Sequence, residues 1–130
     1  MQTVAEHSDY IRAIVVHPTL PYVLSCSDDS TIVLYDWDKK WQKVNTFMDH
    51  GHYVMQVAIN PCDTNMFASA SLDKTIKIWS ISGNKKTANY SLIGHKAGVN
   101  SIDFSRSFDK PQLVSGGDDG LVKVWDYQTK

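Results

Sequence analysis

Short runs of alternating apolar and polar residues recur along the chain, with turn-forming residues between them. The stretch SASLDKTIKIW, residues 69–79, contains two such runs on either side of a turn that holds Asp73. A period of two residues is typical of half-buried β-strands, and no stretch has the longer period of an amphipathic helix. In the first third of the chain the pattern predicts strands near residues 11–16, 22–27, 31–37 and 43–48. The sequence therefore predicts an all-β protein.

Three copies of one unit organise these strands. The runs SCSDDSTIVLYD (residues 25–36), SASLDKTIKIWS (69–80) and SGGDDGLVKVWD (115–126) align without a gap, 44 and then 46 residues apart. A histidine followed by an apolar strand precedes each copy, beginning at His7, His50 and His95. Self-similarity at a fixed period indicates a repeat architecture, in which each unit packs against its neighbours.

A unit of several short strands that closes on W-D and follows a histidine resembles the WD40 repeat of β-propellers. The resemblance implies an all-β WD40 β-propeller fragment of about three four-stranded blades, with incomplete first and last elements. Residues 1–6 are expected to be the outer strand of a preceding blade, 7–49 blade one, 50–94 blade two, and 95–130 a third blade that lacks its outer strand.

In WD40 blades a histidine, a serine, a turn aspartate and a tryptophan form a hydrogen-bonded chain, so the resemblance implies one tetrad in each unit. The first tetrad departs from the pattern, because Tyr35 stands where the other two have tryptophan. The matching positions are His7, Ser25, Asp29 and Tyr35; His50, Ser69, Asp73 and Trp79; and His95, Ser115, Asp119 and Trp125.

The aspartate of each tetrad is interpreted as scaffolding. A buried carboxylate destabilises a fold unless hydrogen bonds satisfy it, and this chain of donors supplies them. A Ser-His-Asp catalytic triad is the alternative interpretation. Threefold repetition argues against it, since an active site normally occurs once, and no G-x-S-x-G motif is present. We expect no enzymatic activity.

Composition narrows the function classes. The chain has 130 residues, 42% hydrophobic and 21% charged, values typical of a soluble globular domain. The net charge of −1 predicts no general attraction to nucleic acid. No apolar run is long enough to span a membrane, and MQTVAEHSDYIR lacks signal-peptide features, so a cytoplasmic location is expected. Cys26 and Cys62 are far apart and suggest no disulfide, metal site or cofactor.

The loop charges are expected to separate onto two faces of the propeller. One face carries the acidic residues Glu6, Asp9, Asp28, Asp49 and Asp118, with Arg12 and Lys96 as exceptions. The other carries Lys39, Lys40, Lys85, Lys86, Arg106 and Lys110. Solvated loop charges are the plain interpretation of both sets.

The acidic face also suggests a binding site. Asp28 and Asp118 are not needed for the tetrads, so their side chains are expected to be free to face the axis or solvent. Asp9, Tyr10 and Arg12 lie on the same rim. Two carboxylates and a guanidinium beside an aromatic ring suit a peptide that carries both an amine and a carboxylate. For the lysine-rich turns of the other face, contact with anionic membrane is the alternative to solvation.

A closer resemblance covers nearly the whole chain. The runs HSDYIRAIVVHPTLPYVLSCSDDS, YDWDKKW, HYVMQVAINP, FASASLDKTIKIW and GGDDGLVKVWDYQTK resemble the first propeller of the beta-prime subunit of the COPI coatomer. The alpha subunit is similar around HYVM and SDD but fits DWDKKW less well. The resemblance implies a non-catalytic vesicle-coat propeller that binds C-terminal dilysine retrieval signals of membrane cargo for Golgi-to-ER transport.

The same resemblance implies the site residues. Asp9 and Asp28 match acidic positions that take the lysines, Arg12 matches a basic position, and Tyr10 fits as a wall of the pocket. The family's remaining basic residues would lie upstream of Met1. A generic WD40 interaction scaffold from another assembly, using this face for a different peptide, is the alternative.

Partners follow from the resemblance and from the predicted ends. Other coatomer subunits and peripheral association with Golgi membranes and COPI-coated vesicles are expected, and no nucleic acid. An unpaired strand at one end and a blade without its outer strand at the other are complementary. Two chains are therefore predicted to pair head to tail into a closed ring.

Overall fold

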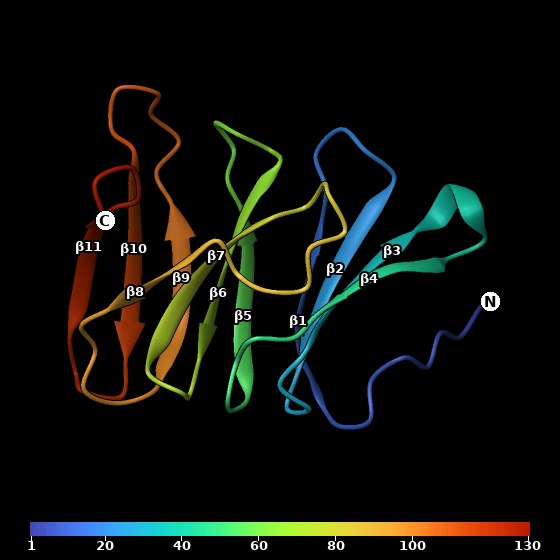
Figure 1. The fold of residues 1–130 in the computed structure, drawn as a ribbon, viewed down its shortest axis with the longest axis horizontal. Helices are drawn as coiled ribbons and strands as arrows, with labels where there is room; N and C mark the ends of the chain where they lie inside the picture. Colours follow the sequence, from blue (N-terminus) through green and yellow to red (C-terminus); the bar gives the residue numbers. More distant parts are fainter.

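A computed structural model describes residues 1–130 as three antiparallel sheets arranged in a row (Figure 1). Sheet one, called blade one below, contains β1 (Ile11–Val16), β2 (Tyr22–Ser27), β3 (Ile32–Asp36) and β4 (Gln42–Phe47). Blade two contains β5 (Val54–Ile59), β6 (Met66–Ser71), β7 (Thr75–Ser80) and β8 (Tyr90–Ile93). Blade three contains β9 (Val99–Phe104), β10 (Gln112–Gly117) and β11 (Val122–Asp126). The predicted all-β propeller fragment is confirmed.

Strands pair in chain order within each blade, so every blade is a meander. The first strands, β1, β5 and β9, lie next to one another along the row, and the Gln56 side chain joins two of them by accepting a 2.9 Å hydrogen bond from the Ile102 amide. One short 3₁₀ turn, η1 (Trp37–Lys39), follows β3. The structure has no helix with the length and apolar character that crossing a membrane requires.

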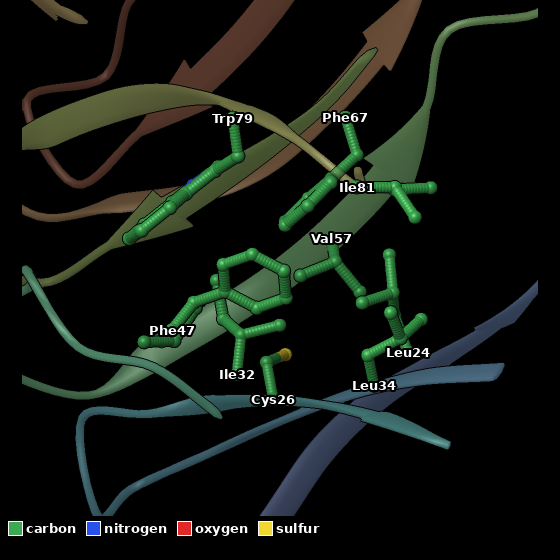
Figure 2. Packing of buried hydrophobic residues seen from close by; sticks show 10 residues of the cluster. Leu24, Cys26, Ile32, Leu34, Phe47, Val57, Phe67, Trp79 and Ile81 are labelled. Atoms are coloured by element: carbon green, nitrogen blue, oxygen red, sulfur yellow. The ribbon is translucent and has the colours of Figure 1, made fainter. Parts of the chain in front are cut away.

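Two apolar clusters lie between the blades. The first joins blade one to blade two, where Phe47 packs edge-on against Phe67 and Trp79, whose rings are stacked (Figure 2). The second joins blade two to blade three around Ile76 and Leu113. Blade two is therefore covered on both faces, and the repeated unit depends on its neighbours for burial.

The β2–β3, β6–β7 and β10–β11 turns share one backbone feature. The residue after the tetrad aspartate has a positive φ in each: 72° at Ser30, 77° at Lys74 and 77° at Gly120. Only at Gly120 does the left-handed conformation occur without side-chain strain. The aspartate side chain stabilises the turn by accepting from the backbone amide two residues later, as in Asp73 to Thr75 at 2.9 Å.

Residues 1–10 form no strand in this structure. The first residues run beside the η1–β4 turn, where the Gln2 side chain donates to the Lys40 carbonyl at 3.3 Å. A strand requires a neighbour to pair with, and residues 1–6 pair with neither β1 nor β4, the two edge strands of blade one. Their assignment to the outer strand of another blade stays a prediction.

Candidate functional site

The predicted tetrad residues lie together in every blade. Histidine Nδ1 is 2.9, 2.7 and 2.9 Å from an aspartate oxygen in blades one, two and three, in the pairs His7–Asp29, His50–Asp73 and His95–Asp119. Histidine Nε2 is 2.7, 2.5 and 2.7 Å from the Oγ of Ser25, Ser69 and Ser115 in the same order.

An indole N–H closes the chain in two blades. Trp79 and Trp125 each donate from Nε1 to the serine Oγ at 2.8 Å. Since an indole nitrogen only donates, the serine accepts there and is left to donate its O–H to histidine Nε2, and Nδ1–H donates to the aspartate. In blade one Tyr35 replaces the indole, and burial raises the pKa of Tyr35, partly offset by the nearby Ser25 hydroxyl.

Hydrogen bonds hold the tetrad aspartates ionised. Burial raises the pKa of Asp73, but bonds from His50 and Thr75 outweigh it, and the pKa falls well below its usual value. At Asp119 the opposing effects of burial and of bonds from Lys96 and His95 leave a pKa of about 2. These carboxylates therefore act as charged anchors of the turns, as expected from scaffolding.

Arg12 and Asp28 form an ion pair at the rim of blade one. Arg12 Nε and Nη2 donate to the two oxygens of Asp28, each at 2.6 Å. The Asp28 side chain is 3% exposed and that of Arg12 is 37% exposed. The hydrogen bond from Arg12 lowers the pKa of Asp28. The expectation that Asp28 is free is therefore wrong: β1–β2 pairing brings the guanidinium over it.

A β-bulge aims Arg12 at its partner. Ile11 pairs with Ser27 and Ala13 with Cys26, so Arg12 is the extra residue of β1. The Asp28 amide also donates to the Tyr10 carbonyl at 2.8 Å, which fixes the second loop against the first. Bulges redirect single side chains in this way and are frequent next to binding sites.

Two tyrosine rings flank the guanidinium. Arg12 Cζ lies 5.9 Å from the ring centroid of Tyr10, which is 74% exposed, and 5.8 Å from that of Tyr53 on the adjacent loop of blade two. His52 packs edge-on against Tyr53. Both distances permit cation–π attraction. We call Asp9, Tyr10, Arg12, Asp28 and Tyr53 the Arg12 cluster.

The Arg12 cluster presents both charges to solvent. Asp9 is exposed and uses one oxygen to accept from the Tyr10 amide at 2.8 Å. The Nη1 of Arg12 makes no hydrogen bond in the structure, since Asp28 takes Nε and Nη2. The cluster thus offers an accessible carboxylate, an available guanidinium edge and two aromatic walls. Its two carboxylates and one guanidinium give it a net negative charge. It can bind a cation and an anion side by side.

The chain is similar to a described repeat family along almost its whole length. The family described as "WD domain, G-beta repeat" matches residues 1–36, 41–80 and 86–126. The matched segments contain all three tetrads. The chain belongs to the WD40 repeat family.

This WD40 chain is also similar to subunits of one vesicle coat. Coatomer subunit beta'-2 of Arabidopsis thaliana is 58% identical over 96 residues, which cover 74% of this chain and 10% of that protein. Probable coatomer subunit beta' of Schizosaccharomyces pombe is 54% identical over 93 residues, covering 72% and 11%. Coatomer subunit beta' of Homo sapiens is 58% identical over 84 residues, covering 65% and 9%.

These similarities confirm the predicted resemblance to coatomer beta-prime subunits. The chain spans about a tenth of the length of the curated relatives it matches. None of them shows what the Arg12 cluster binds, so the site residues stay predictions.

The other two WD40 blades carry different pairs at the positions of Arg12 and Asp28. Blade three has Asn100 and Asp118, joined by a 2.5 Å hydrogen bond from the amide to the carboxylate. Blade two has the apolar pair Met55 and Leu72. Met55 and Asn100 are bulge residues like Arg12. The same β-bulge thus positions an ion pair in blade one, an apolar pair in blade two and an amide–carboxylate pair in blade three.

Sequence reasoning missed Tyr53 and His52 as neighbours of Arg12. A signal was available, because Tyr10 and Tyr53 both lie three residues after a tetrad histidine. Blade three has Gly98 there, where a Cβ would lie 2.6 Å from the Leu72 side chain. Only blades one and two therefore supply an aromatic wall.

Neither cysteine forms a disulfide. Cys26 is buried between blades one and two, and burial raises the pKa of its thiol to about 12. Cys62 is partly buried and unpaired. The structure contains no group of three or more His, Cys, Asp or Glu side chains that could hold a metal ion.

Proposed function

We propose that the chain is a non-catalytic part of a COPI coat propeller and binds C-terminal dilysine retrieval signals of membrane cargo. The Arg12 cluster supports this proposal, because it sets an accessible carboxylate beside an available guanidinium edge. The similarity to coatomer beta' subunits supports the coat assignment.

The chemistry of the bound peptide follows from these groups. A lysine ammonium would bind the exposed Asp9, and the terminal carboxylate would accept from Arg12 Nη1, while Asp28 would hold the guanidinium in place through its two hydrogen bonds. Tyr10 and Tyr53 would hold the aliphatic stem of the lysine. Exposed charge pairs contribute about 0–1 kcal/mol each, so the complex would be weak and sensitive to salt.

The wider assignment belongs to the same proposal. The blades divide at residues 7–49, 50–94 and 95–130, and the coat context adds other coatomer subunits as partners. The location is cytoplasmic and peripheral on Golgi membranes and COPI-coated vesicles, in Golgi-to-ER transport. A generic WD40 scaffold from another assembly would use the Arg12 cluster for a peptide without a free terminus.

The test is a titration of a peptide that ends in two lysines and two further residues into the chain extended upstream to a complete propeller. The same peptide with a C-terminal amide is the ligand control. The expected result is binding that requires the free carboxylate and weakens in Asp28→Ala.

Asp118→Ala is the matched protein control, because Asp118 occupies the same turn position in blade three. We expect Asp28→Ala to weaken binding more than Asp118→Ala. Equal effects would contradict the placement at blade one, and equal binding of the acid and amide peptides would contradict dilysine recognition.

A further inference from the structure

The segment between β7 and β8 leaves blade two and lies over the outer strand of blade one, where Figure 1 draws it in yellow. We call residues 82–88 the strap. The Met48 amide donates to the Lys86 carbonyl at 2.8 Å. The Asn45 side chain donates from Nδ2 to the Lys85 carbonyl at 3.1 Å. The strap thus joins two complete four-stranded blades inside the row, and its contacts involve neither end of the chain.

The two lysines of the strap carry charges that no carboxylate compensates. Lys86 Nζ donates to Asn45 Oδ1 at 3.3 Å, and Lys85 Nζ donates to Asn89 Oδ1 at 3.3 Å. The lysine and arginine ion pairs of the structure involve other residues. Because an amide oxygen is neutral, both ammonium groups are held in place and keep their full charge.

The backbone of the strap adds hydrogen-bond donors. The amides of residues 83–87 donate to no protein group, and these residues are exposed. The carboxylate that bonds to the strap, that of Asp49, accepts from the Ala88 amide at 3.0 Å and not from a lysine. The strap therefore offers solvent two ammonium groups and a run of unpaired amides, which together suit anionic groups.

The positions of the two ammonium groups favour a chain of several carboxylates over one small anion. Lys86 Nζ is held on blade one by Asn45, which is 4% exposed. Lys85 Nζ is held on blade two by Asn89, whose Nδ2 donates to Ser80 Oγ at 2.9 Å. Because the two charges are held on different blades, a ligand that binds both must cross the strap.

We propose that the strap is a docking site for an acidic, extended segment of a partner protein, whose carboxylates bind Lys85 and Lys86. Charge complementarity supports this occupant over a membrane. The strap sequence SGNKKTA has no aromatic or large apolar residue that could enter a lipid surface. Its two lysines are also fewer than the about four to eight basic residues typical of segments that bind anionic lipids. The docking site is separate from the Arg12 cluster and does not depend on dilysine recognition.

The first experiment uses the same extended propeller as the cargo titration. The probe is a fluorescent ten-residue peptide of alternating glutamate and serine, blocked at both ends so that it has no terminal carboxylate for Arg12. Fluorescence anisotropy should show saturable binding at about 50 mM salt that weakens strongly at about 300 mM, because exposed charge pairs are screened. No saturable binding at the lower salt concentration would overturn the proposal.

Two double variants locate the docking site. Lys85→Gln with Lys86→Gln removes both ammonium groups, so affinity for the acidic peptide should fall about fivefold. Lys39→Gln with Lys40→Gln is the matched control, because it removes the same charge from an exposed lysine pair in the β3–β4 turn. The control should lose less than about twofold. Equal losses would mean a general attraction to positive charge and would contradict a site at the strap.

A third variant compensates one charge and leaves both lysines in place. Asn89→Asp puts a carboxylate where Lys85 Nζ now meets an amide oxygen, so affinity should fall about twofold. Gln128→Glu makes the same amide-to-carboxylate change at an exposed residue after β11 and should have no effect. Unchanged affinity in Asn89→Asp would show that Lys85 does not contact the peptide.

Other occupants are tested with the same proteins. Vesicles of phosphatidylcholine and phosphatidylserine should not sediment the propeller through the strap. Sedimentation that Lys85→Gln with Lys86→Gln abolishes would identify a membrane as the occupant instead. Inorganic phosphate should compete with the acidic peptide no better than sodium chloride of equal ionic strength. Stronger competition would indicate a site for a single anion and would refute an extended acidic segment.

Discussion

Blade one and blade two are stabilised by the same hydrogen-bonded tetrad but differ in the side chains at the bulge and the adjoining turn. Both have a tetrad histidine, a serine 18 or 19 residues after it and a turn aspartate 22 or 23 residues after it, and the corresponding hydrogen bonds are 2.7 and 2.9 Å in blade one and 2.5 and 2.7 Å in blade two. The residue before the aspartate differs: Asp28 pairs with the Arg12 bulge in blade one, and Leu72 stands beside Met55 in blade two. Positions that repeat build the fold, and positions that vary are the candidates for recognition.

Blade three sharpens the contrast. Asp118 has the position of Asp28, but its partner Asn100 is neutral. The Asp28 charge is compensated by Arg12, whereas the Asp118 charge is not. Similar turns can therefore differ in electrostatic character through one bulge residue, and the following experiments exploit that difference.

The largest expected effect distinguishes the tetrad aspartate Asp73, which stabilises the fold, from Asp28 at the rim. Asp73→Ala removes the acceptor of His50 and Thr75 and should lower the free energy of unfolding by about 3 kcal/mol. Asp28→Ala should have a much smaller effect, because its partner Arg12 reaches solvent. Urea denaturation followed by tryptophan fluorescence measures both. Similar losses would break the distinction.

Low pH should destabilise the fold by protonating the tetrad aspartates. The folded-state pKa values of Asp73 and Asp119 lie below the unfolded value of about 3.9, so their stabilisation is complete above that pH and is lost as pH falls toward about 2. The urea midpoint should therefore decrease between about pH 4.5 and pH 2.5, and less steeply in Asp73→Asn. An equal slope in both proteins would refute this origin.

Replacing the bulge residue of blade one by that of blade two should weaken peptide binding. Arg12→Met copies Met55 and removes the guanidinium edge, so affinity for a free-acid dilysine peptide should fall about fivefold, corresponding to about 1 kcal/mol. Affinity for the amide peptide should change less. Fluorescence anisotropy of labelled peptides compares the two, and Asn100→Met is the control in blade three. A loss of equal size for both peptides would argue against a carboxylate contact at Arg12.

The smallest effects concern one hydroxyl. Thr75 Oγ1 donates to Asp73 at 2.6 Å, whereas Leu121 has that position in blade three. Thr75→Val should destabilise by about 1 kcal/mol, and Leu121→Thr should stabilise slightly by supplying the missing donor. Thermal unfolding of both variants checks the sign. Destabilisation by Leu121→Thr would show that the exposed leucine contributes through packing instead.

The sequence by itself determined the strands, the three repeated units and the members of the tetrads. Alternation with a period of two specifies a strand locally, and equal spacing in three copies identifies Ser69, Asp73 and Trp79 as structural. The first two strands agree with the prediction in full, and the next two differ only by a residue at their ends, where pairing decides the boundary.

The sequence predicts Asp9, Tyr10, Arg12 and Asp28 as site residues, but only the tertiary structure decided that Arg12 pairs with Asp28 and that Tyr53 joins them. Arg12 and Asp28 are 16 residues apart, and a bulge that leaves no signature in the alternation turns one side chain toward the other. Tyr53 reaches the same guanidinium from another blade. The alternating pattern of a strand indicates which residues face inward. Which loops meet at the rim depends instead on packing between blades, which is a long-range property of the fold.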